Sequence, residues 1–161
     1  MLTHLLSAAE KFVQTFYPAL QSNHASISSF YMAPAAMPPD GKPLPAIVYN
    51  GNVIPDAVTF QNMFQQDMPA VHYEIQSYDC HVLNPNYIVD GIQGVDAASG
   101  KNMTILVAVS GYVKFGGSRD ATARGFSENF VLVPNHDAAT KGRGRHVKEW
   151  LIQSQNFRLV V

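Results

Sequence analysis

The chain has 161 residues, of which 47% are apolar and 14% are charged. This apolar share can offset the entropy of ordering the chain around one core, which excludes intrinsic disorder for most of its length. Eleven basic and twelve acidic residues give a net charge of -1, so no overall field attracts the protein to nucleic acid or to a membrane. The single cysteine excludes an internal disulfide.

Helical signals dominate the beginning of the chain. Apolar residues recur at helical spacing, which predicts an amphipathic helix over residues 2–17 that Pro18 bends or ends. A short helical segment is expected over 26–32. The five prolines within residues 33–45 then predict a loop without regular structure.

A hairpin and a third helix are expected next. Two short apolar runs, 47–49 and 52–54, flank the pair Asn50-Gly51, which is a strong signal for a tight hairpin turn. Asp56 stands at the N-cap position of a helix expected over 57–67.

From Val71 onward the apolar period changes from 3.6 to 2, which is typical of strands. A change of parity near Ser77 predicts a bulge in a long first strand, and residues 84–102 are expected to be mostly loop. Three further strands are expected over 103–115, 125–134 and 147–154. Helices followed by long antiparallel strands predict one α+β domain over 1–161, whose antiparallel sheet bends strongly to enclose the helices.

The expected strands carry apolar residues of both parities. Val131 and Val133, for example, alternate with Phe130 and Leu132. One face of the sheet can pack against the helices, and the other face needs a partner. The strand residues that we expect at this partner interface are Phe130, Leu132, Val113 and Trp150.

The sequence holds no phosphate loop, nucleophile elbow or dinucleotide fingerprint, and its six histidines form no close pair at metal-ligand spacing. We therefore expect no catalytic residues, no cofactor and no metal. One enzymatic alternative is a conical pocket in which a carboxylate, tyrosines and a histidine transfer protons. Its candidate residues are Asp79, Tyr49, Tyr78 and His81, which are equally typical of packing and solvent-facing positions.

The one local positive cluster alternates glycine with cations. It consists of Lys141, Arg143, Arg145 and Lys148. Such a flexible stretch suits contact with RNA phosphates without readout of bases. The alternative is a solvated hairpin loop.

Five strings in order resemble the nuclear transport factor 2-like family. They are Ile-Val-Tyr-Asn-Gly-Asn at 47–52, Ser-Tyr-Asp-Cys-His at 77–81, Gly-Tyr-Val-Lys-Phe at 111–115, Gly-Phe-Ser-Glu-Asn-Phe-Val-Leu at 125–132, and Trp-Leu-Ile at 150–152 with Asn-Phe-Arg-Leu at 156–159. Within that family the match is closest to the small subunit of the heterodimeric messenger-RNA export receptor. The long segments 33–46, 84–102 and 135–145 are similar to the fungal, Mtr-type form.

This resemblance implies a cone-shaped, non-enzymatic subunit that binds the related domain of a larger TAP-type subunit. The heterodimer supports passage of messenger ribonucleoprotein through nuclear pores and shuttles between nucleus and cytoplasm. The resemblance also implies that phenylalanine-glycine repeats bind mainly through the partner and that no membrane is involved. Arg158 is implied to pair with an aspartate of the partner, as a guanidinium can. A homodimeric import carrier of the same fold is the alternative. That carrier binds its GTPase through acidic residues near the corresponding strand pair, whereas residues 116–124 here carry two arginines and one aspartate, so GTPase binding is not supported.

Overall fold

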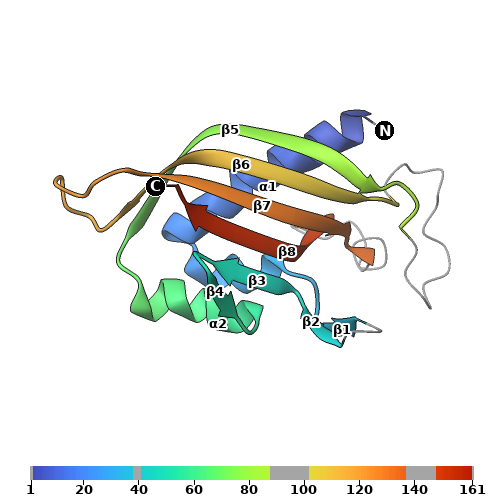
Figure 1. The fold of residues 1–161 in the computed structure, drawn as a ribbon, viewed down its shortest axis with the longest axis horizontal. Helices are drawn as coiled ribbons and strands as arrows, with labels where there is room; N and C mark the ends of the chain where they lie inside the picture. Colours follow the sequence, from blue (N-terminus) through green and yellow to red (C-terminus); the bar gives the residue numbers. More distant parts are fainter. Residues whose placement is uncertain (1, 38–40, 88–101, 137–147, 161) are drawn as a thin grey trace.

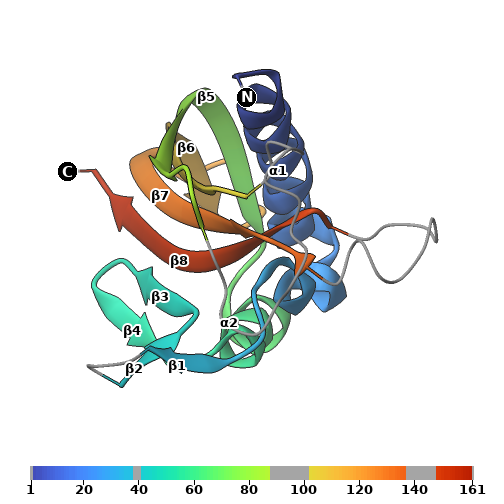
Figure 2. The ribbon, with the colours of Figure 1, turned by 90° about the vertical axis from the view of Figure 1, so that its right-hand side faces the viewer.

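A six-stranded sheet with helices against one of its faces forms the body of the protein (Figure 1). The computed structural model describes residues 2–37, 41–87, 102–136 and 148–160. The strands follow the order β4-β3-β8-β7-β6-β5. Seen from the side, the sheet curves around the long first helix (Figure 2). The α+β class and the curved sheet expected from the sequence are therefore confirmed.

The first helix, α1 (Leu2–Ser22), continues past Pro18, so an end of the helix at that residue, one of the two expected outcomes, is wrong. Proline removes one backbone donor, but Ala19 and Leu20 beyond it are buried in the core. This packing outweighs the lost hydrogen bond. A 3-10 helix, η1 (His24–Phe30), follows close to the predicted helical segment.

The proline-rich stretch contains a small two-stranded sheet, where the sequence predicted only irregular loop. Its strands are β1 (Ala35–Met37) and β2 (Lys42–Leu44), and Pro43 lies opposite Ala36. Both strands of a two-stranded sheet are edge strands, and an edge strand tolerates proline because an outward N–H has no ladder partner to lose.

The predicted tight hairpin is confirmed in β3 (Ala46–Tyr49) and β4 (Asn52–Ile54). Its turn residues, Asn50 and Gly51, have φ angles of 48° and 84°, in the left-handed region that such turns require. Beyond the hairpin, β3 pairs in parallel with β8 and so joins the turn to the main sheet.

The third predicted helix is also present, as α2 (Ala57–Asn62) followed by a π-helical turn, η2 (Met63–Asp67). The Asp56 carboxylate accepts a hydrogen bond from the backbone N–H of Thr59 at 2.7 Å, which confirms the predicted N-cap. No helix in the described part of the chain is long and apolar enough to cross a lipid bilayer.

Four long antiparallel strands make up most of the sheet. The bulge predicted near Ser77 is present, because the register with β6 shifts between Ile75 and Ser77. The last strand was predicted over 147–154, whereas it begins at Trp150 and continues to Leu159. The bounds are Val71–Asn84 for β5, Thr104–Phe115 for β6, Arg124–Pro134 for β7 and Trp150–Leu159 for β8.

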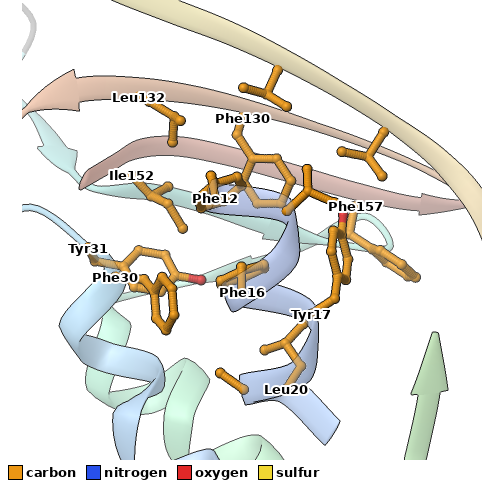
Figure 3. Packing of buried hydrophobic residues seen from close by; sticks show 14 of the residues in the cluster. Phe12, Phe16, Tyr17, Leu20, Phe30, Tyr31, Phe130, Leu132, Ile152 and Phe157 are labelled. Carbon is orange, nitrogen blue, oxygen red and sulfur yellow. The ribbon is translucent and has the colours of Figure 1, made fainter. Parts of the chain in front are cut away.

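The core lies between α1 and the concave face of the sheet, which we call the inner face (Figure 3). Phe12 and Phe16 of α1 pack edge-on against Phe130 of β7, with ring centroids 4.7 and 5.3 Å apart. Edge-to-face contacts of this kind add to the stabilisation from burial alone. The inner face is therefore filled from within this chain.

Candidate partner interface

The opposite face of the sheet, which we call the outer face, carries three cross-strand rows of mostly small side chains. Leu106, Ala108 and Val131 are only half-buried at its centre, as is Ser154, whereas the other serines and asparagines of the rows are exposed. The rows are His81–Leu106–Val131–Ser154–Ala46, Asp79–Ala108–Asn129–Asn156–Val48 and Ser77–Ser110–Ser127–Arg158. Short side chains let a second sheet approach to the spacing of about 10 Å at which sheets pack face to face.

A bulge in β8 determines which of its residues reach the outer face. Ile152 and Phe157 are both fully buried on the inner face although five positions separate them, which strict alternation forbids. The register with β7 shifts at this point and leaves Gln153 as the extra residue. As a result, Ser154, Asn156 and Arg158 face outward.

The backbone around Arg158 is fixed by the β3–β4 turn. The N–H of Asn50 donates to the carbonyl of Phe157 at 2.7 Å, and the N–H of Leu159 donates to the Asn50 side-chain oxygen at 3.2 Å. Arg158 stands between these two anchored residues, opposite Ser127 of β7, with its side chain exposed. An anchored backbone with an exposed guanidinium suits bidentate contact with a carboxylate on another molecule.

The structure corrects three of the five residues expected at the partner interface. Val113, Phe130 and Leu132 are fully buried on the inner face, so they cannot touch a second protein. Trp150 also has the inner parity, because it shares a face with Ile152; it is half-buried and packs against the core. The prediction that the strands carry apolar residues on both faces is confirmed. The apolar residues that face outward, however, are Leu106, Ala108 and Val131, which have the opposite parity to the residues predicted at the interface.

The basic cluster lies mostly outside the described residues, which exclude Lys141, Arg143 and Arg145. Its fourth member, Lys148, is half-buried. The Lys148 ammonium donates to the Ser29 hydroxyl at 2.7 Å and lies 4.4 Å from the centre of the Phe30 ring. Burial lowers the pKa of Lys148.

Of the candidate residues of the enzymatic alternative, the structure brings only Asp79 and His81 into contact, and it does not place them in a pocket with Tyr49. Asp79 and His81 form a hydrogen bond of 3.0 Å at the solvent-exposed outer face of β5. Tyr49 is buried on the inner face, stacked on Phe157, while Tyr78 is exposed. Among the described residues no group of three or more His, Cys, Asp or Glu side chains is placed to hold a metal ion.

A buried polar network around Glu128 was missed from the sequence. Glu128 is 1% exposed; its two carboxylate oxygens accept hydrogen bonds from the Tyr17 hydroxyl at 2.7 Å and from the Gln155 amide at 2.8 Å. Gln155 in turn accepts a hydrogen bond from the Tyr31 hydroxyl. Burial raises the pKa of Glu128 to about 7, and the two donors oppose this rise.

The parity of β7 was the available signal for this network. In the run Phe-Ser-Glu-Asn-Phe at 126–130, the glutamate lies two residues from each phenylalanine and so shares their face. A glutamate at an inward position requires buried donors, which Tyr17 and Gln155 supply. Because both of its oxygens are occupied and the carboxylate is shielded from solvent, Glu128 here is a structural group within the core.

A curved sheet filled from inside by a long helix is the architecture of the nuclear transport factor 2-like fold, which solved structures similar to this chain share. The chain's residues 4–155 match the family model of the nuclear pore RNA shuttling protein Mtr2. This chain belongs to that family.

Solved structures and curated relatives agree with this assignment. The structure described as a Sac3N peptide bound to Mex67:Mtr2 contains a chain that is 27% identical, with a TM-score of 0.76, over 96% of this chain and 98% of that one. The Chaetomium thermophilum Mex67 NTF2-like domain complexed with Mtr2 gives the same identity and TM-score over 96% and 97%. NTF2-related export protein 1 of Bos taurus is 27% identical over 94% of this chain and 85% of the relative.

Membership in the family confirms the main functional expectations from the sequence. The chain is of the type that serves as the small subunit of a messenger-RNA export heterodimer, and this type is non-enzymatic. The enzymatic alternative is thereby set aside.

Proposed function

We propose that this chain pairs, through the outer face of its sheet, with the NTF2-like domain of a larger Mex67-type, or TAP-type, subunit. The heterodimer carries messenger ribonucleoprotein through nuclear pores and moves between nucleus and cytoplasm. The observation that carries the proposal is the contrast between an inner face filled by this chain's own helices and an outer face whose central apolar residues are only half-buried.

The composition of the outer face supports a sheet-to-sheet contact. Leu106, Ala108 and Val131 supply apolar area at the centre, and the surrounding serines and asparagines can hydrogen-bond to a polar partner surface. Permanent complexes bury more than about 2,000 Å² in total. We expect an interface of this class, with Arg158 at its margin paired to a partner carboxylate.

Two accompanying features are part of the same proposal. Phenylalanine-glycine repeats of nucleoporins bind mainly through the larger subunit. The basic stretch of this chain contributes sequence-independent contacts to RNA phosphates through Lys141, Arg143 and Arg145, and to a smaller extent through Lys148, whose ammonium is already engaged by Ser29 and Phe30.

The test replaces Arg158 in a co-expressed heterodimer. Arg158→Ala should weaken the complex by about 2–5 kcal/mol, because it leaves a desolvated partner carboxylate unpaired. Arg158→Asp should weaken it further through like-charge contact. The dissociation constant is measured by isothermal titration calorimetry or by analytical ultracentrifugation.

Arg124→Ala is the matched control. Arg124 is another exposed arginine of the same sheet. It lies at the beginning of β7, opposite Val113, and shares the inner-face parity of Phe126. This variant should leave the dissociation constant unchanged. If both Arg158 variants bind like wild type, the outer face does not use this residue and the proposed docking mode is wrong.

A further inference from the structure

A groove runs along α1 on the side of the molecule away from the outer face. It encloses about 690 Å³ between α1, η1 and the segment that enters β8. Its lining residues on α1 extend from Ala8 to Ser22, a span of about 21 Å at the helical rise of 1.5 Å per residue. A groove of this length matches about six residues of extended chain, so its shape suits a peptide segment.

The floor of the groove is apolar. Phe12, Ala19 and Phe30 are nearly completely buried there, and Trp150 is half-buried at one wall. Trp150 therefore lines this groove on the inner side of the sheet. An apolar or aromatic side chain of a bound segment can pack on this floor without displacing the core.

Two lysines supply positive charge at the groove. Lys11 is exposed on α1, and Lys148 is half-buried with its ammonium held by Ser29 and over Phe30. Within the described residues neither ammonium forms an ion pair with a carboxylate, and no acidic side chain of that part of the chain lines the groove. A partly desolvated cation without a counter-charge favours an anionic ligand group.

Pro18 adds a backbone acceptor to the same groove. Proline has no N–H, so the carbonyl of Gln14, four residues earlier, lacks its helical donor. Gln14 and Pro18 both line the groove. An acceptor that the helix leaves unpaired can receive a backbone N–H from an extended segment.

We propose that this groove is a second docking site, which takes a short linear segment of another protein with an acidic residue beside an apolar or aromatic one. Helix α1 covers the inner face of the sheet (Figure 2), so the groove stays open when the outer face is occupied. The heterodimer can therefore hold such a segment and its larger subunit at once. A nucleic acid strand fits less well, because two lysines stand over an apolar floor.

Fluorescence anisotropy with the purified heterodimer tests this proposal. The probe is a fluorescein-labelled decapeptide with one phenylalanine and one leucine flanked by aspartates. Two control peptides replace the aspartates by lysine or the apolar pair by serine. The acidic, apolar probe should bind at least tenfold more tightly than either control, because each control removes one of the two recognition elements.

Variants locate the binding. Lys148→Glu combined with Lys11→Glu should weaken probe binding at least tenfold, whereas Lys42→Glu, the same charge reversal on β2, should not. Because Lys148 also packs on Phe30, Thr15→Trp serves as a second variant that fills the groove from an exposed position of α1. Thr15→Trp should abolish binding while the heterodimer remains intact.

Two results overturn the proposal. One is that the probe does not bind, or that it binds but none of the groove variants changes its affinity. The other is that the peptide does not bind, whereas a labelled poly-uridine oligonucleotide does, and that Lys148→Glu and Thr15→Trp weaken the binding of the oligonucleotide. The groove would then be a contact for nucleic acid.

Discussion

The two faces of the same sheet differ in what fills them. Along β7, the inward residues Phe126, Glu128 and Phe130 are at most 1% exposed, whereas the outward Ser127 and Asn129 between them are open to solvent. The inner face is completed by helices of this chain, and its polar atoms have partners within the core. The inner face therefore determines whether the chain folds, and we expect the outer face to determine what it binds.

The largest test of this comparison is Phe130→Ala. The ring packs against Phe12 and Phe16 and pairs across the sheet with Val107. Its removal leaves a cavity at the centre of the inner face, and we expect a loss of about 3–5 kcal/mol in the free energy of unfolding. Urea unfolding of the heterodimer at fixed concentration measures it. A loss below about 1 kcal/mol would mean that the inner face tolerates rearrangement.

The second test uses the charge buried in the inner face. The folded pKa of Glu128, about 7, lies above its ordinary value of 4.5. The folded protein therefore binds this proton more tightly than the unfolded chain does, and stability falls as the pH rises from about 4.5 through 7. The shift corresponds to roughly 3 kcal/mol. Burial raises the pKa values of the nearby tyrosines Tyr17 and Tyr31 well above their ordinary value of 10. These tyrosines therefore do not titrate between pH 4.5 and 7.

Glu128→Gln isolates this contribution. The amide keeps the shape of the side chain and cannot ionise, so the variant should lose most of the decline between pH 4.5 and 7. Stability of variant and wild type is compared by urea unfolding of the heterodimer at several pH values. Because other groups titrate equally in both proteins, their effects cancel in the difference. A pH dependence identical in the two proteins would show that Glu128 does not titrate in this range.

The same comparison explains how far the sequence could predict the fold. Alternation located the long strands, and local chemistry located the Asn50-Gly51 turn and the Asp56 cap, because each depends on residues close in the chain. The strands of the proline-rich stretch escaped prediction, because their pairing opposes the local preference of proline. The outcome at Pro18 depended on the burial of Ala19 and Leu20, which only the tertiary structure reveals.

Assignment of side chains to a face was harder than location of the strands. Apolar residues occupied both parities of β7, so the pattern alone did not show which parity the helices cover. Phe130 and Leu132, the larger side chains, belong to the core, while the smaller Val131 belongs to the outer face. In β8 the extra residue Gln153 changed the parity between Ile152 and Phe157. Arg158, carried over from a family motif, is the one predicted interface residue whose side chain faces outward.

The smallest expected effect belongs to the residue next to Phe130. Asn129→Ala removes an exposed side chain from the middle row of the outer face, between Ala108 and Asn156, and leaves the inner face untouched. Surface substitutions of this kind change the free energy of unfolding by less than about 0.5 kcal/mol. Urea unfolding of the chain, followed by circular dichroism under conditions that dissociate the heterodimer, should therefore give the wild-type midpoint. Calorimetric titration with the larger subunit should show weaker binding, because a polar contact is lost. A shifted midpoint with unchanged binding would reverse the roles assigned to the two faces, because the outer face would then contribute to folding and not to association.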